Sequence, residues 1–295
     1  MWFLGRILRL LPLLMWLPLA GQSHPPPGSP NRDSKAAAPA RQTTDQSDHL
    51  QDRDRELLGT VRISTGEWPP YNGQNLPHYG SANRIVEEAF RLANIEVVFS
   101  FYPWTRAYSL VKEGHWDASS VWAHQPGREN DFVFSEPIFE ATQVFFHLKT
   151  TPLEWTELED LRHWRIGGTL GYTYPVLTKA ENEGLLTMER ASSDILNFRK
   201  LLAGRIDLFT IERHVGLYLR KYHLSSFESR RLTHHPKPVS QIPMYLIISK
   251  KVPRHREILA RFNRGLETLK KEGLLDAYLA ETIPIAPNPQ PRTPE

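Results

Sequence analysis

Apolar positions between residues 61 and 114 follow two different periods. Apolar side chains occupy alternate positions in 61–65 and in 95–101, which predicts two strands. They recur every three to four residues in 82–93 and in 104–111, which predicts two amphipathic helices. Gly114 is placed to cap the second helix at its C-terminus. Strands that alternate with helices indicate an α/β fold with a parallel-type sheet.

The same alternation returns in the second half of the chain, after residue 165. The predicted elements are a strand near 165–168, a helix from about residue 174, a helix at 195–202, strands at 206–209 and 245–248, and a helix at 258–269. Gly204 and Gly273 are placed to end two of these helices.

One short motif occurs in both halves. Gly114 is followed by Asp117 and Gly204 by Asp207, each time between a predicted helix and a predicted strand. Two unrelated helix-to-strand junctions would give the same pattern, because Gly commonly caps helices. Alternatively, the motif marks two similar α/β lobes that face each other across a cleft. Ligands of open α/β sheets bind outside the carboxyl ends of the strands, which would place a site in that cleft.

Residues 1–20 have the features of a secretory signal peptide: Arg6 and Arg9 precede a short apolar run that ends at Ala20. The run is shorter than the ~20 residues that span a bilayer. We therefore expect cleavage and export to the periplasm, with an uncleaved anchor as the alternative. Residues 21–57 and 285–295 contain too few large apolar side chains to offset the entropy of ordering. We expect a disordered leader and a loose tail.

The composition narrows the classes of chemistry. The chain has no Cys, so it can form no disulfide and carries no cysteine for lipid attachment, and its net charge of +3 is scattered rather than clustered. The adjacent His234 and His235 diverge on regular structure, and no metal-binding spacing such as HExxH occurs. Phosphate-loop, dinucleotide and serine-hydrolase motifs are missing from the sequence. We expect no metal, no cofactor and no nucleic-acid partner.

A cation stands out in the stretch 101–137. Arg128 lies on a predicted loop that follows a short strand, and aromatic residues surround it in the sequence. A guanidinium in this setting suits the capture of a small anion or zwitterion. The stretch does not resemble a nucleophile paired with a base, nor a set of metal ligands. It therefore favours binding over catalysis.

Several motifs in this order resemble the bacterial solute-binding proteins of the polar amino-acid uptake family. They are TGEWPPY at 65–71, Gly114 with Asp117, Arg128 with FSEP at 134–137, GYT at 171–173, and GRID at 204–207 leading to Glu212. The resemblance covers roughly residues 58–284. It implies the type II periplasmic binding fold, with two lobes, a hinge and a cleft between the lobes. Lobe 1 would comprise 58–148 and 243–284, and lobe 2 would comprise 149–242.

The resemblance also implies roles for charged residues. Arg128 would hold the carboxylate of the ligand, which fits a permanent charge and bidentate geometry. The alternative is a surface ion pair of Arg128 with Glu129 or Asp131. Glu212 holds the place of the acid that pairs with a ligand amino group, although the same residue would serve equally well as an acid at a helix N-terminus.

The other site residues that the resemblance implies are aromatic or carry hydroxyl groups: Trp68, Tyr71, Ser120, Trp122, Tyr172 and Thr173. Trp68 would stack on the ligand, with Tyr71 and Trp122 lining the same cleft. Tyr172 and Thr173 would contact the carboxylate at a helix start, or would simply form a turn. Trp104 and Tyr108 share the apolar stripe of their helix, so we expect both in the core.

One position departs from the family pattern. Ala123 stands where the family usually provides a hydroxyl to the carboxylate, while Ser120 keeps a hydroxyl nearby. Because a lost donor weakens carboxylate binding, our hypothesis is a ligand that is flatter or different at that end, accommodated by Trp122.

The sequence therefore predicts a monomeric periplasmic protein that closes around an amino acid or similar small carboxylate and delivers it to an ABC permease. One alternative is a dehydratase-like enzyme on the same fold, which would need an acid such as Glu67 or Glu212 near Arg128. Another is a ligand-sensing protein that acts on a receptor.

Overall fold

The computed structural model describes residues 59–281. The expected signal peptide at 1–20, the leader at 21–57 and the tail at 285–295 lie outside the described residues. The strands are β1 Thr60–Thr65, β2 Glu96–Phe101, β3 Ala118–Ala123, β4 Phe132–Phe134, β5 Phe139–Leu148, β6 Ile166–Thr169, β7 Met188–Ala191, β8 Leu208–Glu212, β9 Leu232–His234 and β10 Ser240–Ser249. The α-helices are α2 Ser81–Leu92, α3 Trp104–Lys112, α4 Pro175–Asn182, α5 Asp194–Leu202, α6 Arg213–Tyr222, α7 Ser226–Arg231, α8 His255–Lys271 and α9 Leu274–Ala280. Short 3-10 helices occupy Pro77–Tyr79, Arg128–Asn130 and Leu158–Leu161.

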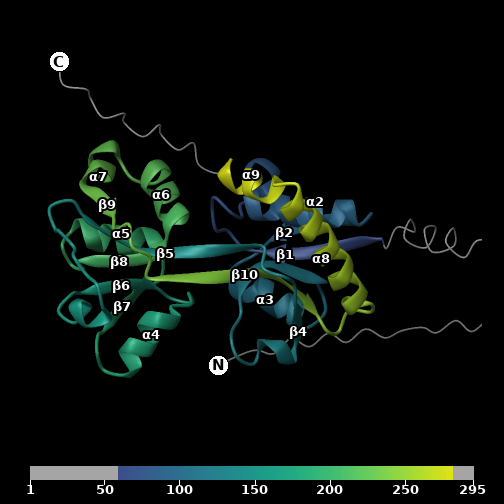
Figure 1. The fold of residues 1–295 in the computed structure, drawn as a ribbon, viewed down its shortest axis with the longest axis horizontal. Helices are drawn as coiled ribbons and strands as arrows, with labels where there is room; N and C mark the ends of the chain where they lie inside the picture. The colour runs from purple at the N-terminus through teal and green to yellow at the C-terminus, as the bar shows by residue number, and fades with distance from the viewer. Residues whose placement is uncertain (1–58, 282–295) are drawn as a thin grey trace, which may run out of the picture. The chain divides into compact units, whose positions relative to one another are not determined.

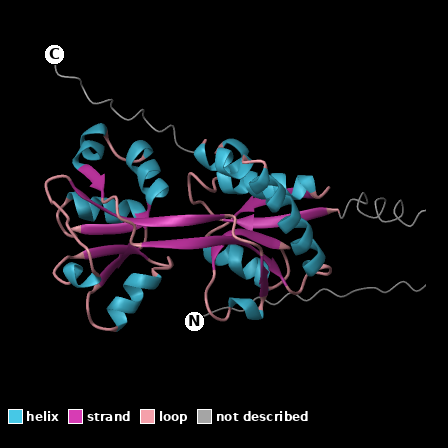
Figure 2. Ribbon diagram, in the orientation of Figure 1, coloured by secondary structure: helices cyan, strands magenta, loops and turns pink. Residues whose placement is uncertain are grey.

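The strands form one mixed sheet with the order β2-β1-β3-β10-β5-β8-β6-β7, flanked by helices (Figure 2). We refer to β1, β2 and β3 as the N-terminal strand group and to β6, β7 and β8 as the middle strand group. Each group is parallel, as the alternating pattern predicts. The prediction of parallel strands is wrong at the centre of the sheet. There, β10 is antiparallel to β3 and to β5, and β5 is antiparallel to β8.

The central strands β5 and β10 connect the two strand groups, and Figure 1 shows them side by side between β8 and β1. β5 pairs with β10 from Phe139 to Gln143 and with β8 from Gln143 to Phe146. β10 pairs with β5 up to Met244 and with β3 from there on. Each central strand therefore changes its partner partway along its length.

The larger apolar core is continuous through these central strands. It includes Ile63 and Phe90 on one side, Val144 of β5, and Phe198 and Phe209 on the other. A smaller cluster around Phe145, Leu161 and Leu177 packs within the middle of the chain. α2 and α8 cross closely in the larger core, because a Cβ on Gly265 would lie only 2.0 Å from the Ala89 carbonyl oxygen.

The repeated Gly and Asp motif has the same structural role in both strand groups. The Asp117 carboxylate accepts hydrogen bonds from the backbone N–H and the guanidinium of Arg62. Asp207 accepts the equivalent bonds from Arg165, at 2.6–3.0 Å. Each Asp precedes a strand and ties it to an Arg within or directly before the neighbouring strand. The motif thus marks the same helix-to-strand junction in both strand groups, and its Asp residues stabilise the pairing of neighbouring strands.

No helix in the described range 59–281 is long and apolar enough to cross a membrane.

Candidate ligand-binding site

A cavity of about 620 Å³ is lined by residues of the N-terminal strand group, the middle strand group and the central strands. Six of the predicted site residues line it: Trp68, Trp122, Arg128, Tyr172, Thr173 and Glu212. Tyr71 and Ser120 are not among the lining residues. The fold therefore brings together side chains that are up to about 140 residues apart in the sequence.

Arg128 lies on the loop after β3, half-buried at the wall of the cavity. Its Nη1 donates a hydrogen bond of 2.6 Å to the Ala123 carbonyl oxygen, and its guanidinium lies 4.9 Å from the centroid of the Trp122 ring and 5.5 Å from that of Tyr108. Burial lowers the pKa of the Arg128 guanidinium, which nevertheless stays charged at neutral pH.

The alternative of a surface ion pair does not describe Arg128. Glu129 lies 3.6 Å from His124, and Asp131 pairs with Lys112 at 2.9 Å. Among the described residues, no carboxylate lies within ion-pair distance of Arg128. A half-buried guanidinium next to a cavity, without an anionic partner of its own, is suited to receive an anion from solution.

A backbone irregularity explains why Trp122 faces the cavity. Successive side chains of a regular strand alternate between faces, yet Val121, Trp122 and Ala123 all line the cavity. Val121 has a φ of 65°, which is unusual for a β-branched residue, and the pairing with β10 shifts register between Tyr245 and Ile247. The irregularity turns the end of β3 so that consecutive residues reach the cavity.

Thr173 is held by two amides that the sequence did not single out. Gln125, on the Arg128 loop, donates from Nε2 to the Thr173 hydroxyl oxygen at 2.6 Å. Gln143 of β5 donates to the Thr173 carbonyl oxygen at 2.9 Å, and its own Oε1 accepts from Ser240. Both glutamines line the cavity. Their amides were missed because a lone Gln carries no sequence signal.

The hydroxyl group of Tyr172 is held by the partly buried carboxyl group of Asp194. Its hydroxyl donates to Asp194 at 2.8 Å, and Thr169 donates to the other oxygen of Asp194 at 2.5 Å. Burial raises the pKa of the Tyr172 hydroxyl well above its usual value, Asp194 raises it further, and the indole N–H of Trp68 acts in the opposite direction. Burial also raises the pKa of Asp194. Trp68 and Tyr172 both line the cavity.

Glu212 acts as an acid at a helix N-terminus, which is one of the two roles that the sequence left open, and it also lines the cavity. It is the N-cap residue of α6, where one carboxylate oxygen accepts the Val215 N–H at 2.8 Å. Its other oxygen accepts the Tyr71 hydroxyl at 3.1 Å and lies 3.3 Å from His214 Nδ1. The side chain lines the cavity, yet only 3% of it is exposed.

Tyr71 and Ser120 belong to buried contacts beside the cavity. The Tyr71 ring stacks on Phe139 with centroids 4.4 Å apart. The Ser120 hydroxyl donates to Asn83 at 2.7 Å and accepts from Asn72 at 3.1 Å. Both hydroxyls therefore have protein partners in the structure.

Trp104 and Tyr108 differ from the expectation that both are core residues, because both line the cavity. A Cβ on Gly66 would lie 2.4 Å from the Trp104 ring, so the missing side chain of Gly66 leaves room for the indole. The Trp104 N–H donates to the Glu67 carbonyl oxygen at 3.2 Å. Tyr108 additionally packs on the small apolar cluster around Val111 and Phe132.

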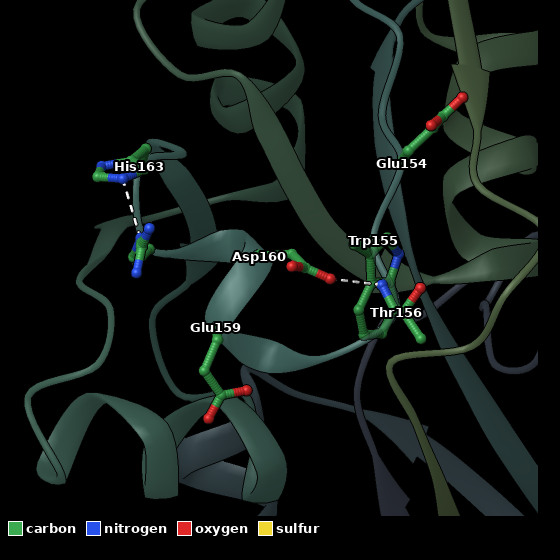
Figure 3. A pocket seen from close by; sticks show the side chains of 7 residues that line it. Glu154, Trp155, Thr156, Glu159, Asp160 and His163 are labelled. Atoms are coloured by element: carbon green, nitrogen blue, oxygen red, sulfur yellow. Dashed lines mark hydrogen bonds between the residues drawn. The ribbon is translucent and has the colours of Figure 1, made fainter.

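A second cavity, of about 510 Å³, lies at Glu154–His163 and contains none of the predicted site residues. Figure 3 shows that Asp160 accepts a hydrogen bond from the Thr156 backbone. Arg162 donates a hydrogen bond of 2.9 Å to His163. Its polar groups thus bond mainly within the loop, and its acidic residues are exposed. Within residues 59–281, no group of His, Asp or Glu is arranged to hold a metal ion.

Comparison with solved structures places this fold among known proteins. A histidine kinase sensor domain with similarity to periplasmic binding proteins has a TM-score of 0.63 at 21% identity, covering 79% of this chain and 98% of its own. An ancestral arginine-binding protein bound to arginine has a TM-score of 0.61 at 21% identity, covering 76% and 98%. An ancestral amino acid-binding protein, a precursor of cyclohexadienyl dehydratase, has a TM-score of 0.59 at 20% identity, covering 80% and 98%. At these identities the likeness shows the fold, which is the type II periplasmic binding fold.

No curated protein matches the sequence. The model of one family matches residues 61–282, which is most of the chain and nearly all of its described part. The chain therefore belongs to the bacterial extracellular solute-binding proteins, family 3.

Proposed function

We propose that this protein captures a small carboxylate, such as an amino acid, in the 620 Å³ cavity. The observation that carries the proposal is Arg128: a half-buried guanidinium at the cavity wall, with no carboxylate partner among the described residues. A charged hydrogen bond formed away from bulk water is stronger than the same bond at an exposed surface. The ligand carboxylate would complete this site.

The remaining contacts come from both sides of the cavity. Thr173 and the backbone around Gly171 lie just before α4, where N–H groups can face an anion. Trp68 offers an aromatic face to the body of the ligand. We assign no direct ligand contact to Tyr71 or Ser120, because their hydroxyls bond protein groups.

The mechanism that we propose is closure of two lobes about β5 and β10. The lobes are residues 58–148 with 243–284, and residues 149–242; the partner changes at Gln143 and Met244 support a hinge within the central strands. Gln125 bonds Thr173 and Tyr71 bonds Glu212 across the cavity. Opening would break these two contacts, and a bound ligand would favour the closed state by its higher affinity for it.

We propose that the protein acts outside the cytoplasm and releases its ligand to an ABC permease. Membership of an extracellular solute-binding family supports this location. The same closure would also serve a protein that senses a ligand for a receptor. A dehydratase would need a free acid near Arg128. Of the two described acids that line the cavity, Glu212 is engaged by Tyr71 and Val215, and Asp131 pairs with Lys112.

A thermal-shift screen of the purified protein against amino acids and small carboxylates tests the proposal. A ligand that binds only the folded state raises the melting temperature. We expect at least one carboxylate to raise it, and the Arg128→Ala variant to lose that shift. If no carboxylate stabilises the protein at millimolar concentration, the proposed function is wrong.

A further inference from the structure

The cavity has an aromatic wall next to Arg128, in which Trp104 and Tyr108 join the expected Trp122. Trp104 and Tyr108 lie one turn apart on α3, and both line the cavity together with Trp122. The Trp104 and Trp122 rings meet edge to face, with centroids 5.3 Å apart and an interplanar angle of 87°. Tyr108 packs on Trp122 at the same centroid distance.

The polar atoms of both indoles are already engaged by the protein. The Trp104 N–H donates to the Glu67 carbonyl oxygen at 3.2 Å, and the Trp122 N–H donates to the Ser119 hydroxyl at 2.7 Å. What both residues present to the cavity is therefore ring surface, which favours an apolar and preferably aromatic group.

The carboxylates that line the cavity within residues 59–281 are engaged as well, so these residues offer a ligand ammonium group no free partner. Glu212 accepts from Tyr71 and Val215 and lies 3.3 Å from His214 Nδ1, so three of its about four acceptor positions face protein groups. Asp131 pairs with Lys112 at 2.9 Å. Asp194, which accepts from Thr169 and Tyr172, does not line the cavity. In the described part of the chain, no other acid lines this cavity.

We infer that the site selects an aromatic carboxylic acid and does not require an amino group on it. The carboxylate binds Arg128, and the ring packs against Trp104 and Trp122. This inference rests on the proposed function, since it names the class of carboxylate that the same cavity takes. It also explains why Ala123 can replace the hydroxyl residue that the family usually has there. This wall would bind the ligand through ring contacts and would not need a hydroxyl donor.

Four probes separate the contributions of the ring and of the amino group: 3-phenylpropionate, phenylalanine, propionate and alanine, titrated calorimetrically into the wild-type protein. We expect 3-phenylpropionate to bind about tenfold or more tightly than propionate, because the ring buries apolar area. We expect phenylalanine and 3-phenylpropionate to differ by less than about threefold.

The inference is overturned if phenylalanine binds more than about tenfold tighter than 3-phenylpropionate, or if the ring confers no advantage over propionate or alanine. It is also overturned if none of the four binds. The proposed function survives that last result when another carboxylate still binds in a manner that depends on Arg128, so the two failures can be told apart.

Variants of the wall provide the second readout. Trp104→Ala should lower the affinity for 3-phenylpropionate about tenfold more than the affinity for propionate. Trp104→Phe, which keeps an apolar ring, should retain most of the wild-type affinity for 3-phenylpropionate. It can still be measured if the alanine variant does not fold. The matched control is Trp164→Phe, because Trp164 packs in the smaller apolar cluster and does not line the cavity. An unchanged affinity in both Trp104 variants would contradict the inference.

Discussion

The guanidinium of Arg128 lies 4.9 Å from the centroid of the Trp122 ring, within the range of a cation–π contact. Together with the hydrogen bond to Ala123, this contact fixes the guanidinium before any ligand arrives. A group held in its binding orientation loses less conformational entropy when the ligand binds. Trp122 is therefore a positioning residue for Arg128 as well as a part of the cavity wall.

Replacing Trp122 by Leu should weaken the binding of any carboxylate that depends on Arg128, even one without a ring. We expect a loss of about 5- to 10-fold, since a partly desolvated cation–π contact contributes about 1 kcal/mol. Calorimetry with the ligand from the thermal-shift screen measures it. Trp116→Leu is the control, because Trp116 contacts Tyr102 and does not line the cavity. Equal affinities in both variants would show that Trp122 does not position Arg128.

Tyr71→Phe tests the contact between Tyr71 and Glu212. The Tyr71 hydroxyl donates to the Glu212 carboxylate, which is only 3% exposed. Removing the hydroxyl leaves a buried carboxylate oxygen with one hydrogen bond fewer. We expect the free energy of unfolding to fall by about 1–2 kcal/mol in urea titrations. Tyr79→Phe is the matched control because Tyr79 is 43% exposed. A Tyr71 variant as stable as this control would mean that the hydroxyl contributes nothing.

The raised pKa of the Tyr172 hydroxyl predicts a loss of stability at high pH. The folded protein keeps this proton above pH 10, whereas the unfolded chain releases it near pH 10. The contribution is thus fully present below pH 10 and declines as the pH rises from there, by about 1 kcal/mol per pH unit. In Tyr172→Phe, the free energy of unfolding should depend less steeply on pH between pH 10 and 11. Parallel curves for the two proteins would contradict the assignment.

Asp207→Asn should destabilise the fold without changing ligand affinity. Arg165 lowers the pKa of the Asp207 carboxyl by hydrogen bonding and charge, so the stabilisation is present at neutral pH and is lost as the pH falls below about 4. We expect a loss of about 1–2 kcal/mol at pH 7 that shrinks toward pH 3. The exposed Asp276 of α9 provides the control, as Asp276→Asn. A change in affinity would instead connect this junction with the site.

Individual helices and strands could be predicted from the sequence because apolar spacing and capping residues, which determine them, lie within the same short segment. The apolar spacing at 258–269 predicted the helix that spans His255–Lys271, and Gly114 and Gly204 adopt the positive φ of helix ends. The antiparallel pairing of β5 and β10 was missed. Strand partners depend on contacts between distant segments, and neither strand carries a signal for its direction.

The site was predicted in part, for the same reason. Arg128, Trp68 and Thr173 stood out by residue type and by order along the chain, and all three line the cavity. Gln125 was missed because its bond to Thr173 joins residues 48 positions apart and exists only in the fold. Trp104 was assigned to the core from its helical stripe, because the stripe cannot show that Gly66 leaves room for the ring beside the cavity.

The central claim is that Arg128 binds the carboxylate of the ligand, and calorimetric titration of two variants tests it most directly. Arg128→Ala should lower the affinity about 10- to 100-fold or abolish measurable binding, with the melting temperature of the ligand-free protein nearly unchanged. Arg256→Ala, at an exposed position of α8, should bind like the wild type. If the Arg128 variant retains wild-type affinity, the cavity does not bind its ligand through this guanidinium.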